Sequence, residues 1–242
     1  MHIRFFDTID STSLQARREI DANRGPSRPT TLIAVRQSGA VGRLGRTWHS
    51  PAGGLWMTTV WPAPAVVDSL LAIRVGLGIV CAVETTLELT PPVLNLKWPN
   101  DILWGDKKVA GILIESLCRK DRAFLLVGIG INANFAVEAL PTDLHATATT
   151  LQIRAGHPLD LERLRTRTIG AVEMAITRPE TDLDAAASRL WGLHRSMTVS
   201  TPSGTRLTGV MKGLSPAGAL ILEAAGETLE IQSIETLSRA DS

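Results

Sequence analysis

Lys97-Trp98-Pro99-Asn100-Asp101 ends a short apolar segment near the middle of the 242-residue chain. The residue before a proline is pushed toward extended backbone, so we expect the strand over 95–98 to stop at Trp98. Lys97 would then lie on a rigid element, which suits a cation that must reach one position. The alternative is an ordinary surface lysine followed by a turn at Asn100 and Asp101.

The segments around this pentapeptide predict a sheet. Short apolar runs over 95–98, 102–104, 109–117 and 123–131 are typical of four successive strands. Their connections at 105–106 and 120–121 are short, which favours antiparallel hairpins. Three earlier runs, over 3–9, 31–35 and 55–61, predict further strands.

We predict helices over 11–21, 66–89, 161–176 and 183–193. In the third of these, apolar residues recur at helical spacing. Ser11-Thr12-Ser13 offers hydroxyls for a helix N-cap. Gly76 and Gly78 each lower helix propensity by about 1 kcal/mol, and their small size allows close packing against a sheet. We therefore expect an α+β fold: a mixed, largely antiparallel sheet with helices on its faces.

The pattern changes near residue 194. Short strand candidates over 197–200, 206–212, 219–223 and 228–232 are separated by turn residues. This pattern predicts a small β-barrel. We expect two domains, over residues 1–193 and 194–242, with fraying at the end of the chain.

A segment rich in glycine and arginine follows the strand over 31–35, and we call residues 38–47 the flap. Gly39, Gly42 and Gly45 lower the steric cost of unusual backbone angles, so several amides can turn toward one ligand. Arg43 and Arg46 add guanidinium groups that match phosphate or carboxylate oxygens. The alternative is a solvated surface loop. No G-K-[ST] follows, so this is not a Walker loop, nor is it the Rossmann fingerprint.

Glycines also interrupt the predicted apolar strands at 111, 128 and 130. A glycine inside a strand often marks a bulge or a ligand that approaches the backbone. Asn132 and Asn134, at the end of the last strand, could bind a polar head group or an ion. The alternative is a twisted core strand with a polar exit.

The composition is typical of a folded protein and argues against several other classes of protein. A hydrophobic fraction of 44% and a charged fraction of 20% are ordinary for a folded protein, and the net charge of +1 predicts no broad attraction to nucleic acid or membrane. We expect a cytoplasmic protein, because no apolar run is long enough for a membrane span or a signal peptide. Cys81 and Cys118 lie in apolar segments, outside any CxxC, and are expected to be buried structural thiols rather than zinc ligands.

These motifs resemble those of the biotin protein ligases, of the biotin–[acetyl-CoA carboxylase] ligase type. The chain segments that match the family's pattern follow in its order and spacing across essentially the whole chain. They are Asp10-Ser11-Thr12-Ser13, the flap with Trp48, Ser50-Pro51-Ala52-Gly53-Gly54-Leu55-Trp56, 97–101, 108–115, 128–132 and 210–222.

The resemblance implies the biotin/lipoate ligase catalytic fold followed by a small, SH3-like C-terminal β-barrel. It also implies a two-step reaction that uses ATP, biotin and Mg²⁺. Biotin and ATP form biotinyl-5′-AMP and pyrophosphate, and a lysine of a biotin carboxyl carrier protein then displaces AMP. Lys97 and Arg43 are the expected catalytic residues. The residues expected to bind biotin are Ser11, Thr12, Gln37, Gly42, Arg43, Lys97, Gly111, Gly128 and Gly130. Those expected to bind the nucleotide are Arg43, Arg46, Trp48, Asn100 and Asn132.

The chain departs from the family's pattern at two places. The flap usually opens with a Gly-Arg pair, where this chain has Ala40 and Val41. We expect a working enzyme that retains its adenylate less tightly. The matching motifs begin at residue 10, so we expect neither the N-terminal DNA-binding domain of some relatives nor specific DNA binding.

Two other functions remain open at this point. A lipoate–protein ligase shares the fold and a single site lysine, and a non-catalytic protein that senses biotin or its adenylate would fit Val41. The motifs over 43–48 and 97–101 favour biotin. We expect a monomer or a homodimer.

Overall fold

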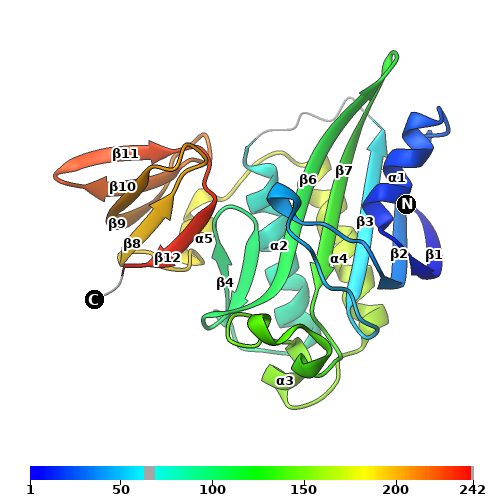
Figure 1. Ribbon diagram of the computed structural model, residues 1–242, viewed down its shortest axis with the longest axis horizontal. Helices are drawn as coiled ribbons and strands as arrows, with labels where there is room; N and C mark the ends of the chain where they lie inside the picture. The colour runs from blue at the N-terminus through cyan, green and yellow to red at the C-terminus, as the bar shows by residue number, and fades with distance from the viewer. Residues whose placement is uncertain (63–68, 241–242) are drawn as a thin grey trace.

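The computed structural model describes residues 1–62 and 69–240. Figure 1 shows two sheets, with the smaller, C-terminal one beside the β4 end of the larger. The larger sheet has seven strands in the order β1-β2-β3-β7-β6-β5-β4. Their bounds are β1 His2–Ile9, β2 Thr30–Gln37, β3 Leu55–Pro62, β4 Leu94–Lys97, β5 Asp101–Trp104, β6 Lys107–Arg119 and β7 Arg122–Ile131.

The pairing in this sheet is mixed and largely antiparallel, as predicted. Only β1 and β2 pair in parallel among the described strands of this sheet. Three short connections join β4, β5, β6 and β7, and the two strands on either side of each connection pair antiparallel. Gly105 and Lys120 take positive φ angles of 63° and 55° in the last two connections, which lets the chain reverse in very few residues.

Helices cover both faces of the sheet. Their bounds are α1 Thr12–Asp21, α2 Leu71–Thr86, α3 Leu151–Ala155, α4 Leu161–Thr177 and α5 Leu183–Ser188. On the face covered by α1, Leu126 of β7 belongs to a small hydrophobic core. On the opposite face, Val127 and Ile129 belong to the main core, to which α2 and α4 contribute. Because side chains alternate along a strand, Gly128 and Gly130 lie on the α1 face. That face is therefore left open where the glycines lie.

Two of the predicted helices differ from their predicted bounds, and α3 was not predicted. α2 begins at Leu71, and residues 66–68 of the predicted helix lie outside the described residues. α5 ends at Ser188 rather than near 193, because the next segment pairs with β4: Leu96 N donates to Arg189 O at 2.7 Å and Trp191 N to Leu96 O at 2.8 Å. Tertiary pairing thus replaces the last helical turns.

The glycines of α2 have the packing role that their size suggested. A β-carbon at Gly76 would lie 2.9 Å from Leu96 of β4, so the helix approaches the sheet closely there. Gly78 instead faces α4, where a β-carbon would lie 2.7 Å from that of Ala171.

The second sheet is antiparallel and has the order β11-β10-β9-β8-β12. The bounds are β8 Ser196–Ser200, β9 Arg206–Leu214, β10 Leu220–Ala224, β11 Glu227–Ile231 and β12 Thr236–Arg239. The first four were predicted, whereas β12 was missed because it is short and buries only Leu237. The domain boundary at 193–194 stays a prediction; the main core continues into this sheet through Met197 and Val199.

The prediction of buried cysteines is wrong. Cys81 and Cys118 are both exposed, since each lies on the outward side of its helix or strand. Among the described residues no helix is long and apolar enough to cross a membrane.

Candidate active site

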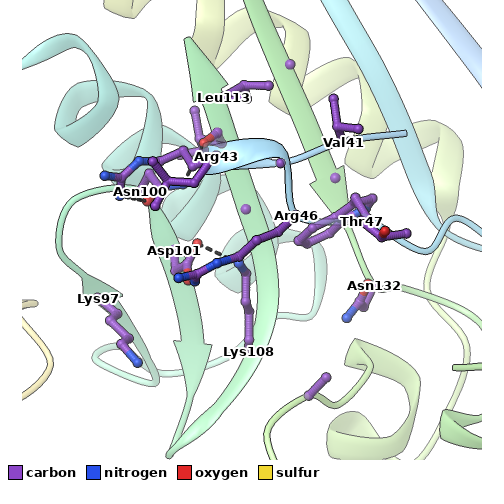
Figure 2. A pocket seen from close by; sticks show the side chains of 18 of the residues that line it. Val41, Arg43, Arg46, Thr47, Lys97, Asn100, Asp101, Lys108, Leu113 and Asn132 are labelled. Atoms are coloured by element: carbon purple, nitrogen blue, oxygen red, sulfur yellow. Dashed lines mark hydrogen bonds and ion pairs between the residues drawn. The ribbon is translucent and has the colours of Figure 1, made fainter. Parts of the chain in front are cut away.

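A cavity of about 660 Å³ lies on the open face of the large sheet and reaches the C-terminal sheet. Its lining brings together all the residues expected to bind biotin or the nucleotide: Ser11, Thr12, Gln37, Gly42, Arg43, Arg46, Trp48, Lys97, Asn100, Gly111, Gly128, Gly130 and Asn132. Asn134, also proposed as a polar ligand, lies outside this lining: its side-chain amide donates to Leu159 O at 2.7 Å and accepts from Leu159 N at 2.8 Å. Figure 2 shows Arg43, Arg46, Lys97 and Lys108 on one side of the sheet. The fixed lysine and the flap therefore share one space.

Lys97 is the last residue of β4 and lies directly opposite Asp101 of β5. Its ammonium nitrogen is 4.9 Å from the centre of the Trp191 ring, and it has no ion pair within the part of the chain that the structure describes. Burial lowers the pKa of Lys97, because the charged form loses water; the Asp101 carboxylate opposes this, and Lys108 and Arg46 add to it. A half-buried cation without an anionic partner is well placed to receive one.

The flap folds into a small hairpin over the cavity. Val41 pairs with Thr47, Gly42 N donates to Arg46 O at 2.7 Å, and a 3₁₀ turn (η1, Arg43–Gly45) forms the tip. Leu44 has a φ of 57°, which is uncommon for a branched side chain, and its side chain is 59% exposed. The strained, exposed tip fits a segment that moves when a ligand binds.

The two flap arginines are held differently. Arg43 donates to Asn100 Oδ1 at 3.0 Å and to Ile234 O at 2.9 Å, so it joins the flap to the β4–β5 turn and to the segment between β11 and β12. Burial lowers the pKa of Arg43, although the group remains a cation. Arg46 is exposed and donates to Glu235 O at 3.2 Å.

Trp48 lies against the two glycine positions of β6 and β7. A β-carbon at Gly130 would lie 2.5 Å from the Trp48 indole, and one at Gly111 would lie 3.0 Å from it. The indole also meets Trp56 edge-on, with ring centres 6.4 Å apart. Among the described residues its buried N–H has no acceptor. An unsatisfied buried donor at a cavity wall is a natural contact for a ligand.

Gly130→Ala is expected to displace Trp48 and thereby weaken ligand binding. Overpacking of this kind costs about 1–3 kcal/mol. Titration calorimetry with biotin and with ATP, together with the melting temperature, measures the effect. Gly170→Ala is the control, because a β-carbon there meets nothing within 4 Å. Unchanged dissociation constants for Gly130→Ala would show that Trp48 does not shape the site.

One end of the cavity is a network of hydroxyl and amide groups. Thr12 Oγ1 lies 2.8 Å from Thr58 Oγ1, and Ser13 Oγ lies 2.8 Å from the same atom. Gln37 Oε1 accepts from Thr12 N at 2.7 Å, and Gln37 Nε2 donates to Ser50 Oγ at 3.0 Å. Ser11 Oγ accepts from Leu14 N and caps α1. Such a network can both donate to and accept from a polar head group.

The opposite end is more apolar. Leu140, Leu144 and Ala148 line it beside Trp48 and Asn132. The Asn132 amide donates to Thr149 O at 3.2 Å, which fixes its carbonyl oxygen. The Asn100 amide nitrogen donates to Ile112 O of β6 at 2.8 Å, and its carbonyl oxygen accepts from Arg43. Asn100 therefore joins the β4–β5 turn both to β6 and to the flap.

Sequence reasoning missed several lining residues. Ser13 and Thr58 complete the hydroxyl network, and Lys108 forms an ion pair with Asp101 at 2.7 Å while lying 4.9 Å from the Trp48 ring centre. Lys108 could have been found from the sequence, because it belongs to the quoted motif over 108–115 and lies three residues before Gly111 on β6. Trp191 had no signal, because its place depends on pairing with β4. Within the described residues no group of three or more potential metal ligands is present.

The fold and the cavity together match a known class of protein. The sequence pattern of the Biotin/lipoate A/B protein ligase family matches residues 5–132, more than half of the chain, and the chain belongs to that family.

Particular relatives extend this match. The biotin–[acetyl-CoA-carboxylase] ligase of Paracoccus denitrificans is 31% identical, over 88% of this chain and 90% of that protein. The bifunctional ligase/repressor BirA of Bacillus subtilis is 30% identical, over 92% of this chain and 69% of that protein. The biotin protein ligase of Aquifex aeolicus, solved with biotin and ATP, superposes with a TM-score of 0.83 at 28% identity and covers 99% of both chains.

Proposed function

We propose that this protein is an ATP-dependent biotin protein ligase that modifies a lysine of a biotin carboxyl carrier protein. One observation supports this most: a single cavity joins a hydroxyl and amide network, a half-buried lysine and a flap that carries two arginines. The names of the relatives agree, since the ligase of Paracoccus denitrificans is named for acetyl-CoA carboxylase. The Aquifex aeolicus structure was solved with biotin and ATP.

In the first step, a biotin carboxylate oxygen attacks the α-phosphorus of ATP. The bond between that phosphorus and the bridging oxygen breaks, and pyrophosphate leaves with the electron pair. Two anions repel each other on approach, so the site needs cations where the charge accumulates. In this proposal Lys97 contacts the carboxylate and α-phosphate oxygens, while Arg43 and Arg46 hold phosphates. The hydroxyl network of Thr12, Gln37 and their neighbours binds the ureido ring.

In the second step, the neutral amine of the acceptor lysine attacks the acyl carbon of biotinyl-5′-AMP. An amide forms, the bond to AMP breaks and one proton is released. Lys97 stabilises the departing phosphate oxygen. The flap excludes water from the mixed anhydride in the interval between the two steps.

Magnesium enters this scheme with the nucleotide, as part of the substrate. The described residues offer no cluster of protein ligands, and Asp101 is paired with Lys108. Mg²⁺ bound by phosphate oxygens and water would screen the charge of pyrophosphate. The protein itself then needs to supply only cationic and hydroxyl side chains.

Val41 bears on how long the intermediate stays bound. Its side chain is 44% exposed and apolar, at the position where the family's pattern has an arginine. The flap therefore lacks one guanidinium over the ligand. We expect more biotinyl-5′-AMP to escape into solution than with an arginine there, which makes Val41→Arg a direct comparison.

The function is tested by supplying purified protein with ATP, Mg²⁺ and either biotin or lipoate. The expected result is pyrophosphate release with biotin, and biotin attached to a carrier domain when that domain is added. Release with lipoate instead would make the protein a lipoate ligase. Biotin binding without pyrophosphate release would make it a sensor.

A further inference from the structure

Trp191 lies in a segment outside the quoted motifs, yet it forms part of the cavity wall. Its backbone is fixed beside the site lysine: Leu190 pairs in parallel with Leu96, and Trp191 N donates to Leu96 O at 2.8 Å. The position of Trp191 is therefore set by β4, the strand that ends at Lys97.

A buried ion pair anchors the same segment on its other side. Arg189 donates to both carboxylate oxygens of Glu84 on α2, at 2.6 and 3.0 Å, and Glu84 is only 3% exposed. The Glu84 carboxylate also accepts from Val93 N and Leu94 N at the start of β4. One buried carboxylate thus ties together the strand that carries Lys97 and the segment that carries Trp191.

The indole itself is also fixed. Trp191 Nε1 donates to Asp106 Oδ1 at 2.9 Å, and the Arg239 guanidinium donates to the same oxygen at 2.7 Å. Arg239 Cζ lies 5.5 Å from the Trp191 ring centre. The ring is held between the β5–β6 turn and β12, with Lys97 Nζ 4.9 Å from its centre.

We propose that Trp191 is a positioning residue for Lys97, and that its ring face holds the lysine in the ammonium form and aims it before an anion binds. This rests on the proposed function, in which Lys97 contacts the reacting oxygens. The negative face of an indole attracts a cation, most strongly where water is excluded. In an empty cavity the ring substitutes for the carboxylate or phosphate that Lys97 later meets.

The other charges around Lys97 explain why such support matters. Asp101 on β5 favours the ammonium, but its carboxylate is shared with Lys108 on β6. Lys108 and Arg46 both disfavour a second cation, and so does burial. Asp106 and Arg239 lie beyond the ring, where their opposite charges form an ion pair.

The decisive comparison is between Trp191→Phe and Trp191→Leu. Both variants lose the bond to Asp106 and reduce the volume of the side chain, but only phenylalanine keeps an aromatic face. The titration of Lys97 is read directly, by the pH dependence of its labelling with an amine-selective reagent and mass spectrometry. We expect the Lys97 pKa to be about half to one unit lower in Trp191→Leu than in Trp191→Phe.

Activity gives a second readout with a defined sign. The ammonium is needed, so the rate of biotin-dependent pyrophosphate release is full below the Lys97 pKa and falls as pH rises through it. A lowered pKa moves this alkaline limit to lower pH in Trp191→Leu. Using the first step alone avoids the titration of the acceptor lysine.

Trp104→Phe and Trp104→Leu are the matched control pair. Trp104 also has a cation near its ring, with Arg154 Cζ at 5.9 Å, but it lies outside the cavity lining. We expect Lys97 to titrate identically in these two variants. If Trp191→Leu does not fold, fluorinated tryptophan at position 191 weakens the ring face at nearly constant shape and must lower the Lys97 pKa.

Equal Lys97 titration in Trp191→Phe and Trp191→Leu would overturn the proposal. That outcome in a protein that still makes biotinyl-5′-AMP leaves the proposed function intact. If the protein lacks ligase activity but the Lys97 pKa still differs between the two variants, the proposed function is wrong and the proposal for Trp191 and Lys97 stands.

Discussion

Lys97→Ala is expected to lower kcat/KM for biotin-dependent pyrophosphate release by about 100- to 1,000-fold, the usual effect of removing one group that stabilises transition-state charge. Lys97 lies on a rigid strand, with its ammonium against the Trp191 ring. Removing it leaves the carboxylate and α-phosphate to meet without a counter-charge. Quenched-flow or steady-state assay of pyrophosphate measures the loss.

Lys107→Ala is the matched control for this substitution. Lys107 is on β6 of the same sheet, but its ammonium donates to His145 O at 2.9 Å and it is absent from the cavity lining. We expect its variant to keep near-normal turnover. The melting temperature of Lys97→Ala should remain close to the original, because Lys97 has no ion pair to lose within the described residues. Near-normal turnover in Lys97→Ala would show that another residue carries the chemistry.

Arg43→Ala is expected to have the second largest effect, a loss of about 10- to 100-fold in kcat/KM for ATP, as expected when hydrogen bonds to a charged group are removed. Arg43 joins the flap to Asn100 and to Ile234 O. Its removal both deletes a phosphate contact and releases the flap. The same assay should therefore show a raised KM and more adenylate lost to solution.

Arg46→Ala separates these two causes. Arg46 is exposed and makes one contact, to Glu235 O, so it contributes phosphate binding with little anchoring of the flap. We expect a loss of about tenfold or less, because exposed charges are screened by solvent. An effect as large as that of Arg43→Ala would contradict the anchoring role of Arg43.

Local patterns were sufficient to predict most of the large sheet. The strands over 95–131 are apolar and joined by very short connections, and a short connection leaves few alternatives to a hairpin. Elements that depend on distant partners were predicted less well. β12 forms because it pairs with β8, and α5 stops early because Arg189 and Trp191 pair with Leu96.

The same distinction holds for the site. Residues carried by motifs, such as Lys97, Arg43 and Gly130, line one cavity as expected. Thr58 and Trp191 lie outside those motifs, and their places follow from strand register and from the segment after α5. The exposed cysteines show a related limit: an apolar run does not say which of its residues face outward.

In the proposed mechanism, Lys97 and the flap meet at the bond formed between biotin and AMP. A crystal structure with a non-hydrolysable analogue of biotinyl-5′-AMP tests this most directly. We expect Lys97 Nζ within hydrogen-bond distance of the acyl or phosphate oxygens, the flap closed over the ligand, and the ureido ring at Thr12. An analogue bound with its phosphate away from Lys97, or outside the cavity, would contradict it.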